Sequence, residues 1–156
     1  DLFLEKVKEH EGIIIKLLYL YVDSKEDKRV MYQEIVLQAW RSIGRFRGDS
    51  KFSTWLYRVG LNTVMTFNRQ EKRMTKESLD IAPEPTHLPT EKSDRSHKLA
   101  LAIRQLGEVE KSIITLHLED YTNEEISDII GISKNNVAVK IHRIKDHLKK
   151  KLNGNG

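Results

Sequence analysis

A cluster of cations and amides lies near the carboxyl end of the chain, at the start of a predicted helix. Its members are Lys134, Asn135, Asn136, Lys140, His142 and Arg143. Cations can contact phosphate oxygens, while amide and guanidinium groups can form hydrogen bonds with base edges in a DNA major groove. The cluster therefore predicts a DNA-reading surface, although the solvated face of an ordinary amphipathic helix would have a similar composition.

Two helices separated by a glycine turn would position this cluster. Thr122 and Glu125 have the spacing of a capping box that begins the first helix. Gly131 stands where the turn needs a positive φ, and Ser133 can cap the second helix. Apolar residues then recur every three or four positions, namely Val137, Ile141, Ile144 and Leu148. The pattern predicts a helix-turn-helix, a motif that places its second helix in a major groove.

A second nucleic-acid surface is indicated by the segment FRGDSKFSTWLYRVGLNTV, residues 46–64. A cationic loop leads here into a helix that alternates aromatic, arginine and asparagine side chains. This combination suits single-stranded nucleic acid, because cations follow the phosphates while polar or aromatic groups hold an unstacked base. We expect Phe52 and Trp55 to be core aromatics instead, and we assign binding to Arg58, Asn62 and the cations of the loop.

Charge is segregated along the 156 residues, whose formal net charge is +4. Residues 1–40 and 77–130 are net acidic, at −2 and −7, whereas residues 41–76 and 131–156 are net basic, at +7 and +6. Two basic zones divided by an acidic stretch predict two surfaces that contact polyanions. Such contacts to phosphates would give a salt-sensitive affinity that does not depend on sequence.

Several classes of protein are disfavoured by composition. The absence of cysteine excludes disulfides and cysteine-based zinc or iron–sulfur sites. The six histidines lack metal-ligand spacing, and neither a glycine-rich phosphate loop nor a nucleophile elbow occurs, so we expect no metal, no cofactor and no enzymatic activity. No apolar run approaches the roughly 20 residues of a membrane span, and no signal peptide is visible. We therefore expect a cytoplasmic protein without membrane insertion.

Periodicity predicts an all-α fold of two small helical domains joined by a flexible linker. The three prolines all lie between Ala82 and Thr90, and the linker is predicted over residues 77–93. The first domain, residues 1–76, combines an apolar-periodic stretch over 2–22 with predicted helices over 29–43 and 53–75. The second, residues 94–152, combines predicted helices over 94–106 and 108–120 with the helix-turn-helix in a four-helix unit.

The same periodicity predicts which residues face the two cores. The helix over 29–43 would bury Ile35, Val36, Ala39, Trp40 and Ile43. The helix over 53–75 would bury Trp55, Leu56, Val59, Thr63 and Phe67. In the second domain, the helix over 108–120 would turn Val109, Ile113, Leu116 and His117 inward.

Three segments in this order resemble the extracytoplasmic-function (ECF) sigma factors of bacterial RNA polymerase, within the sigma-seventy family. They are YQEIVLQAW over residues 32–40, FRGDSKFSTWLYRVGLN over residues 46–62, and the helix-turn-helix. The resemblance runs from about residue 10 to residue 152. It implies a factor that directs promoter-specific transcription initiation and does not itself catalyse RNA synthesis.

The resemblance also implies a role for each domain. Residues 1–76 would bind core polymerase and recognise and melt the minus-ten element, and residues 94–152 would recognise the minus-thirty-five element. Polymerase contacts are implied at Tyr32, Gln33 and Glu34. Minus-ten contacts are implied at Arg45, Arg47, Lys51, Arg58, Asn62 and Arg69, with Asn62 helping to form a pocket for a flipped-out base. Minus-thirty-five contacts are implied at Lys134, Asn135, Asn136, Lys140, His142 and Arg143.

Three partners follow from the resemblance: core RNA polymerase, promoter DNA and an anti-sigma factor. The chain departs from the family pattern at Val30, where an acidic residue is usual. In the recognition helix, Ala138 replaces a frequent cation and Val139 replaces a small polar residue. We therefore expect base reading to depend on Asn135, Asn136, Lys140, His142 and Arg143.

Two other functions are compatible with parts of the sequence. A stand-alone helix-turn-helix regulator would bind duplex DNA without polymerase, as a dimer on paired half-sites, but no obvious dimerisation helix supports it. An RNA-binding adaptor would use the basic loop and treat the helix-turn-helix as a scaffold. Preference for RNA over promoter DNA would distinguish the adaptor.

Overall fold

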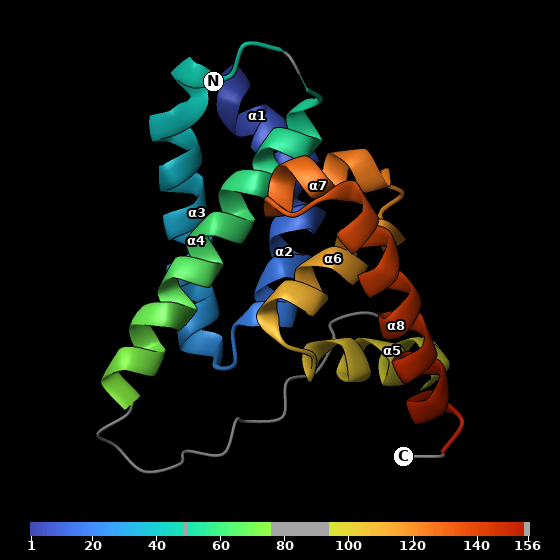
Figure 1. Ribbon diagram of the computed structural model, residues 1–156. Helices are drawn as coiled ribbons and strands as arrows, with labels where there is room; N and C mark the ends of the chain where they lie inside the picture. Colours follow the sequence, from blue (N-terminus) through green and yellow to red (C-terminus); the bar gives the residue numbers. More distant parts are fainter. Residues whose placement is uncertain (49, 76–93, 155–156) are drawn as a thin grey trace. The chain divides into compact units, whose positions relative to one another are not determined.

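The structure is a computed structural model that describes residues 1–48, 50–75 and 94–154. Its regular elements over these residues are all helices, so the predicted all-α class is confirmed (Figure 1). The chain divides into two compact units, Asp1–Leu88 and Pro89–Gly156. The predicted linker, residues 77–93, lies outside the described residues.

Over its described residues, 1–48 and 50–75, the first unit contains four α-helices and one short 3₁₀ turn. They are α1 (Leu2–Glu9), α2 (Glu11–Tyr21), α3 (Lys25–Ser42), η1 (Ile43–Arg45) and α4 (Phe52–Thr75). Helices α2, α3 and α4 pack against one another in every pairing, and Figure 1 shows α3 and α4 side by side. Their shared core contains fully buried side chains from each helix: Ile14, Leu17, Ile35, Leu56 and Val64.

Local signals set where these helices begin and end. The apolar-periodic stretch over 2–22 forms two helices, because the backbone leaves helical geometry at His10. Ser24 caps α3 by accepting a hydrogen bond from the backbone N–H of Asp27 at 3.0 Å. Helix α3 therefore begins at Lys25, one turn earlier than the predicted residue 29.

Helix α4 lies very close to α2 at Gly60. A Cβ atom built at Gly60 would lie 2.7 Å from Cδ1 of Leu17, so any larger residue there would force the buried Leu17 side chain to shift. Further along, the side-chain amide of Asn68 donates to the backbone oxygen of Tyr21 at 3.0 Å. That bond gives a backbone carbonyl in the last turn of α2 a partner on α4. Together the two contacts fix α4 along the length of α2.

The predicted core faces of α3 and α4 are partly wrong. Ile35 and Ala39 are buried, but Trp40 is 54% exposed and makes an edge-on contact with Phe3, with ring centroids 5.4 Å apart. Over residues 52–71 of α4, the predicted Leu56 is buried, whereas Trp55, Val59, Thr63 and Phe67 are half-buried. The other buried residues of this stretch are Phe52, Thr54, Tyr57, Gly60, Leu61 and Val64. Because α4 packs on two helices, its buried face is rotated from the stripe that a single partner would select.

The second unit contains α5 (Asp94–Arg104), α6 (Glu108–Leu118), α7 (Asn123–Ile130) and α8 (Lys134–Leu152). Helix α8 packs against the other three helices. Its predicted apolar seam is confirmed, since the following residues are buried: Val137, Ile141, Ile144 and Leu148. The expected core position of Val109 is wrong, because the first turn of α6 leaves this side chain 39% exposed and continuous burial begins at Lys111.

The helix-turn-helix has the local geometry that the sequence predicts. Thr122 and Glu125 form a reciprocal capping box, with side-chain to backbone distances of 2.9 and 3.1 Å. Gly131 has a φ of 85°, and Ser133 caps α8 by accepting from the backbone N–H of Asn136 at 3.1 Å. In addition, Ser127 donates to the backbone oxygen of Ile132 across the turn. The turn that positions α8 is therefore fixed by hydrogen bonds on both sides.

Candidate nucleic-acid interface

The polar face of α8 is available to a ligand at most of the predicted positions. Five of the six predicted side chains are exposed: Lys134, Asn135, Asn136, His142 and Arg143. Residues in an α-helix are separated by about 100°, so the line opposite the buried seam runs through Asn135, Val139 and Asp146, with His142 and Arg143 on its two sides. This line, rather than the whole predicted cluster, forms the centre of the exposed face.

Lys140 differs from the other predicted DNA contacts. Its ammonium nitrogen lies 3.7 Å from a carboxylate oxygen of Glu110, and the two side chains are 30% and 39% exposed. The partner belongs to α6, so Lys140 lies on the flank of α8 that faces this helix. An ion pair between partly exposed groups is weak, about 0–1 kcal/mol, so a phosphate could compete with Glu110 for Lys140. The geometry favours a flanking role for Lys140 over base reading.

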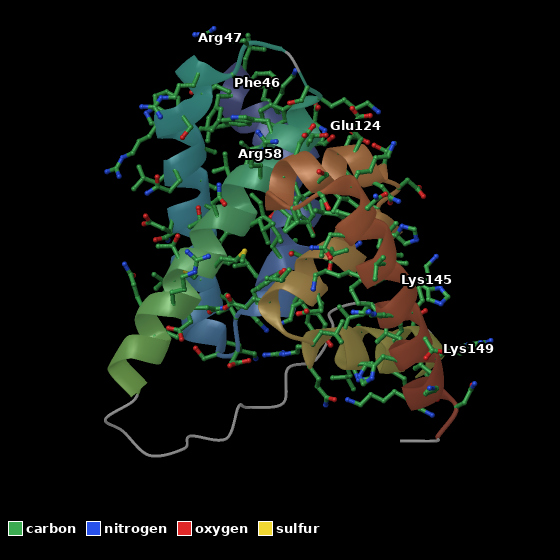
Figure 2. All side chains as sticks on the ribbon, viewed as in Figure 1. Phe46, Arg47, Arg58, Glu124, Lys145 and Lys149 are labelled. Carbon is green, nitrogen blue, oxygen red and sulfur yellow. The ribbon has the colours of Figure 1, made fainter. Side chains whose placement is uncertain are left out.

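An aromatic cluster holds the basic segment that precedes α4. Phe46 lies 5.4 Å from Trp55 and 6.1 Å from Phe52 between ring centroids, and Phe52 lies 5.2 Å from His10. The neighbouring cations Arg45, Arg47 and Lys51 are all exposed. Figure 2 shows Phe46 and Arg47 adjacent in this segment, with Arg58 further along on α4. The aromatic rings therefore anchor the segment through Phe46, while the cationic side chains around it are exposed to solvent.

Asn62 and its polar neighbours follow one strip of α4. Arg58, Asn62, Thr66 and Arg69 are exposed and recur every three or four residues. Asn62 also borders a groove of about 520 Å³ between α3 and α4. The groove is lined by Val30, Met31, Glu34 and Gln38 from α3, and by Asn62, Thr63, Thr66, Phe67 and Gln70 from α4. The structure therefore brings together Asn62 and Glu34, which the sequence assigns to different partners.

The three predicted polymerase contacts have different environments. The Tyr32 hydroxyl donates to a carboxylate oxygen of Glu11 at 3.2 Å, which ties α3 to α2. Burial, then the hydrogen bond to Glu11 and its charge, raise the pKa of Tyr32 above its usual value. Gln33 is exposed, and Glu34 is half-buried and accepts from the side chain of Gln38 at 2.9 Å. Gln33 and Glu34 are thus better placed than Tyr32 to contact a partner.

Comparison with known proteins decides the family. The family description "Sigma-70 region 2" matches residues 7–74, and "Sigma-70, region 4" matches residues 96–148. The ECF RNA polymerase sigma-E factor of Haemophilus influenzae is 31% identical over an alignment 163 residues long. The alignment covers 94% of this chain and 85% of that protein. The chain belongs to the ECF sigma factors of the sigma-70 family. It is an RNA polymerase sigma factor, and a stand-alone regulator is not favoured.

Further relatives cover nearly the whole sigma factor. SigW of Bacillus subtilis is 26% identical over 97% of this chain and 89% of its own length. Among solved structures, the sigma factor RpoE of Bartonella quintana, crystallised with the anti-sigma factor NepR, matches with a TM-score of 0.79. That match covers 96% of this chain and 95% of the other, and its sequence identity of 17% shows a shared fold alone.

The carboxyl half of α8 carries cations of the sigma factor that the predicted contact set left out. Lys145 and Lys149 are exposed and one turn apart on the same side of α8 (Figure 2). Burial, followed by the charge of Lys145, lowers the pKa of His117 on α6, and Asp120 opposes this shift. Sequence shows that these lysines are positively charged, but charge alone does not distinguish a residue that contacts phosphate from one that is only exposed to solvent.

No grouping of residues that could hold a metal ion occurs within residues 1–48, 50–75 and 94–154 of the sigma factor. Over the same described parts of the chain, no helix has the length and apolar character needed to cross a membrane.

Proposed function

We propose that the two units of this sigma factor contact a promoter at two separate places while the first unit also binds polymerase. In this proposal, residues 1–76 bind core RNA polymerase and hold the opened minus-ten element. Residues 94–152 bind the duplex minus-thirty-five element. The observation that carries the proposal is the exposed face of α8, rich in cations and amides, which lies opposite a buried apolar seam in a helix-turn-helix.

The upstream contact would be made by the amino-terminal turns of α8. Asn135, Asn136, His142 and Arg143 are exposed there and offer groups that complement base edges in the major groove. Lys134 and Lys140 would contact phosphates, which position a protein without reading sequence. A helix-turn-helix whose second helix is capped and packed along its length can present these groups without having to order them first.

The downstream contact would capture one strand of the melted promoter. Arg45, Arg47, Lys51, Arg58 and Arg69 would follow its phosphates, and Asn62 would hold a base that has left the stack. An extruded base is offered only by the open state, so binding it shifts the melting equilibrium toward opening. Two weak contacts on one chain also gain from effective concentration.

Partners are proposed from the family and from the neighbouring structures. Gln33 and Glu34, with Tyr32 as a supporting residue, are proposed to contact core RNA polymerase. An anti-sigma factor is proposed as an inhibitor, since the structural neighbour RpoE is a sigma factor that was solved with the anti-sigma factor NepR. The protein would act in the cytoplasm, where polymerase and promoter DNA are found, without catalytic activity or a cofactor of its own.

Co-elution with bacterial core RNA polymerase tests the proposed assembly. We expect a stoichiometric complex in size-exclusion chromatography, and selective initiation when this complex is offered a pool of promoters randomised in both elements. The selected promoters should share one upstream and one downstream sequence, separated by a fixed distance. Tight binding to duplex DNA without any association with polymerase would contradict the proposal and support a stand-alone regulator.

Arg143→Ala is expected to reduce promoter selectivity about tenfold, because a bidentate base contact contributes about 1–3 kcal/mol of discrimination. The measurement is the affinity of the holoenzyme for a selected promoter relative to one with a scrambled upstream element. Lys149→Ala is the matched control, since it removes an exposed cation from a later turn of the same helix. The control should weaken binding to both duplexes equally. An equal loss for Arg143→Ala would mean that Arg143 contacts phosphate.

A further inference from the structure

One apolar side chain stands at the centre of the polar face of α8. Val139 is 47% exposed, four residues after Asn135 and three residues before His142, both of which are exposed. Scattered apolar residues are normal on protein surfaces, so exposure alone carries no argument. The argument depends on the position of Val139. It lies opposite the buried seam and within the first two turns of α8, the part of a recognition helix that reaches base edges.

Lys140, its neighbour in sequence, is directed elsewhere. Lys140 lies on the flank of α8 that faces α6, where its ammonium nitrogen is 3.7 Å from a carboxylate oxygen of Glu110. Sequence alone predicts base reading by Lys140, with Val139 replacing a small polar residue of the family pattern. The central line of the exposed face instead carries Val139, which lies between Asn135 and the flanking His142 along the helix.

The chemistry of valine restricts what this position can select. Its side chain has no hydrogen-bonding group, so it cannot satisfy the nitrogen and oxygen atoms that most base edges display. The major-groove edge of thymine is the exception among the four bases, because it carries a C5 methyl group that apolar side chains contact favourably. Opposite a base edge that offers hydrogen-bonding groups alone, valine would displace water without replacing the lost hydrogen bonds.

We infer that Val139 is a specificity-determining residue that selects thymine in the upstream element by packing against its C5 methyl group. The inference rests on the proposed function, in which α8 enters the major groove. Burying one methyl group between two apolar surfaces has an expected effect of about fourfold on affinity. The effect should be confined to one or two thymine positions, since a single side chain reaches no further along the groove.

Deoxyuridine tests the inference, because uracil pairs as thymine does and lacks only the C5 methyl group. Upstream elements are first selected with the holoenzyme reconstituted from the full chain and core polymerase. Each thymine of the selected upstream element is then replaced by uracil, one position at a time, in synthetic duplexes. We expect one or two replacements to weaken binding by wild-type holoenzyme about fourfold. The Val139→Ala holoenzyme should bind the thymine duplex about fourfold more weakly and should show no further loss with uracil.

Val109→Ala is the matched control, because Val109 is an exposed valine of the same unit at 39% exposure and lies on α6. The control holoenzyme should retain the full uracil effect, and circular dichroism should show equal helix content in all three proteins. A uracil effect of the same size in wild type and Val139→Ala, or no uracil effect at any position, would overturn the inference and leave the proposed function intact. Failure to select any upstream element would overturn the proposed function, and the inference with it.

Discussion

Asn62→Ala is expected to slow open-complex formation about tenfold at a selected promoter and to leave the affinity for core polymerase unchanged. Losing the partner of a desolvated polar group costs about 1–3 kcal/mol, and a tenfold change corresponds to about 1.4 kcal/mol. The primary amide of Asn62 can both donate and accept, which suits the edge of an unpaired base. Because that base is available only after the duplex has melted, the substitution should slow promoter opening and leave polymerase binding unchanged.

The environment of Asn62 sharpens this test. Asn62 and Glu34 border the same groove, from α4 and α3 respectively. If the whole groove contacts polymerase, substituting either residue should weaken the complex with the core enzyme. If the strip with Arg58 and Asn62 contacts DNA, the two substitutions should have separate effects. The shared groove thus makes Glu34→Gln the appropriate partner variant, since it removes a charge and retains the size of the side chain.

The measurement combines two readouts on the same holoenzymes. Stopped-flow fluorescence of a 2-aminopurine base in the minus-ten element reports opening, and competition with a labelled sigma factor reports core affinity. Asn62→Ala should change the first readout alone, and Glu34→Gln the second alone. Normal opening together with weakened core binding in Asn62→Ala would remove Asn62 from the DNA site and assign the groove to polymerase.

The helix-turn-helix was predictable because its signals are local. A capping box and a second cap each join residues three apart, and the positive φ at Gly131 concerns one residue. The apolar seam of α8 repeats every three or four residues and needs no knowledge of its partners. Together these signals determine which face of α8 is exposed, and this is the face that is proposed to contact DNA. The all-α class was predictable from the same local periodicity of apolar residues.

Features that depend on packing between distant segments were less predictable. Trp40 has the spacing of a core residue, yet it lies on the surface against Phe3, 37 positions away in sequence. Likewise, nothing local indicates that Glu110 holds Lys140, or that Asn62 and Glu34 share a groove. Sequence periodicity shows that a helix has two faces. It does not show which of several polar residues has a partner on another helix.

Ile126→Ala should selectively unfold the second unit, which is proposed to bind the upstream DNA element. Of the eight residues of α7, all of them described, only Ile126 is buried, and it is 0% exposed. A helix this short is not stable alone, so α7 depends on its packing against α6 and α8. Truncating a buried isoleucine to alanine costs about 2–5 kcal/mol, which is a large part of the total stability of a small domain.

The positions of the tryptophans allow this effect to be assigned to one unit. Both tryptophans, Trp40 and Trp55, belong to the first unit, so their fluorescence in a urea titration reports that unit, whereas far-ultraviolet circular dichroism reports helices of both. Ile126→Ala should move part of the dichroism transition to lower urea and leave the fluorescence transition in place. Ile129→Ala, at a half-buried position of the same helix, should shift it less. Coincident shifts of both signals would show instead that the two units unfold cooperatively, and promoter contacts at both elements would then be lost together.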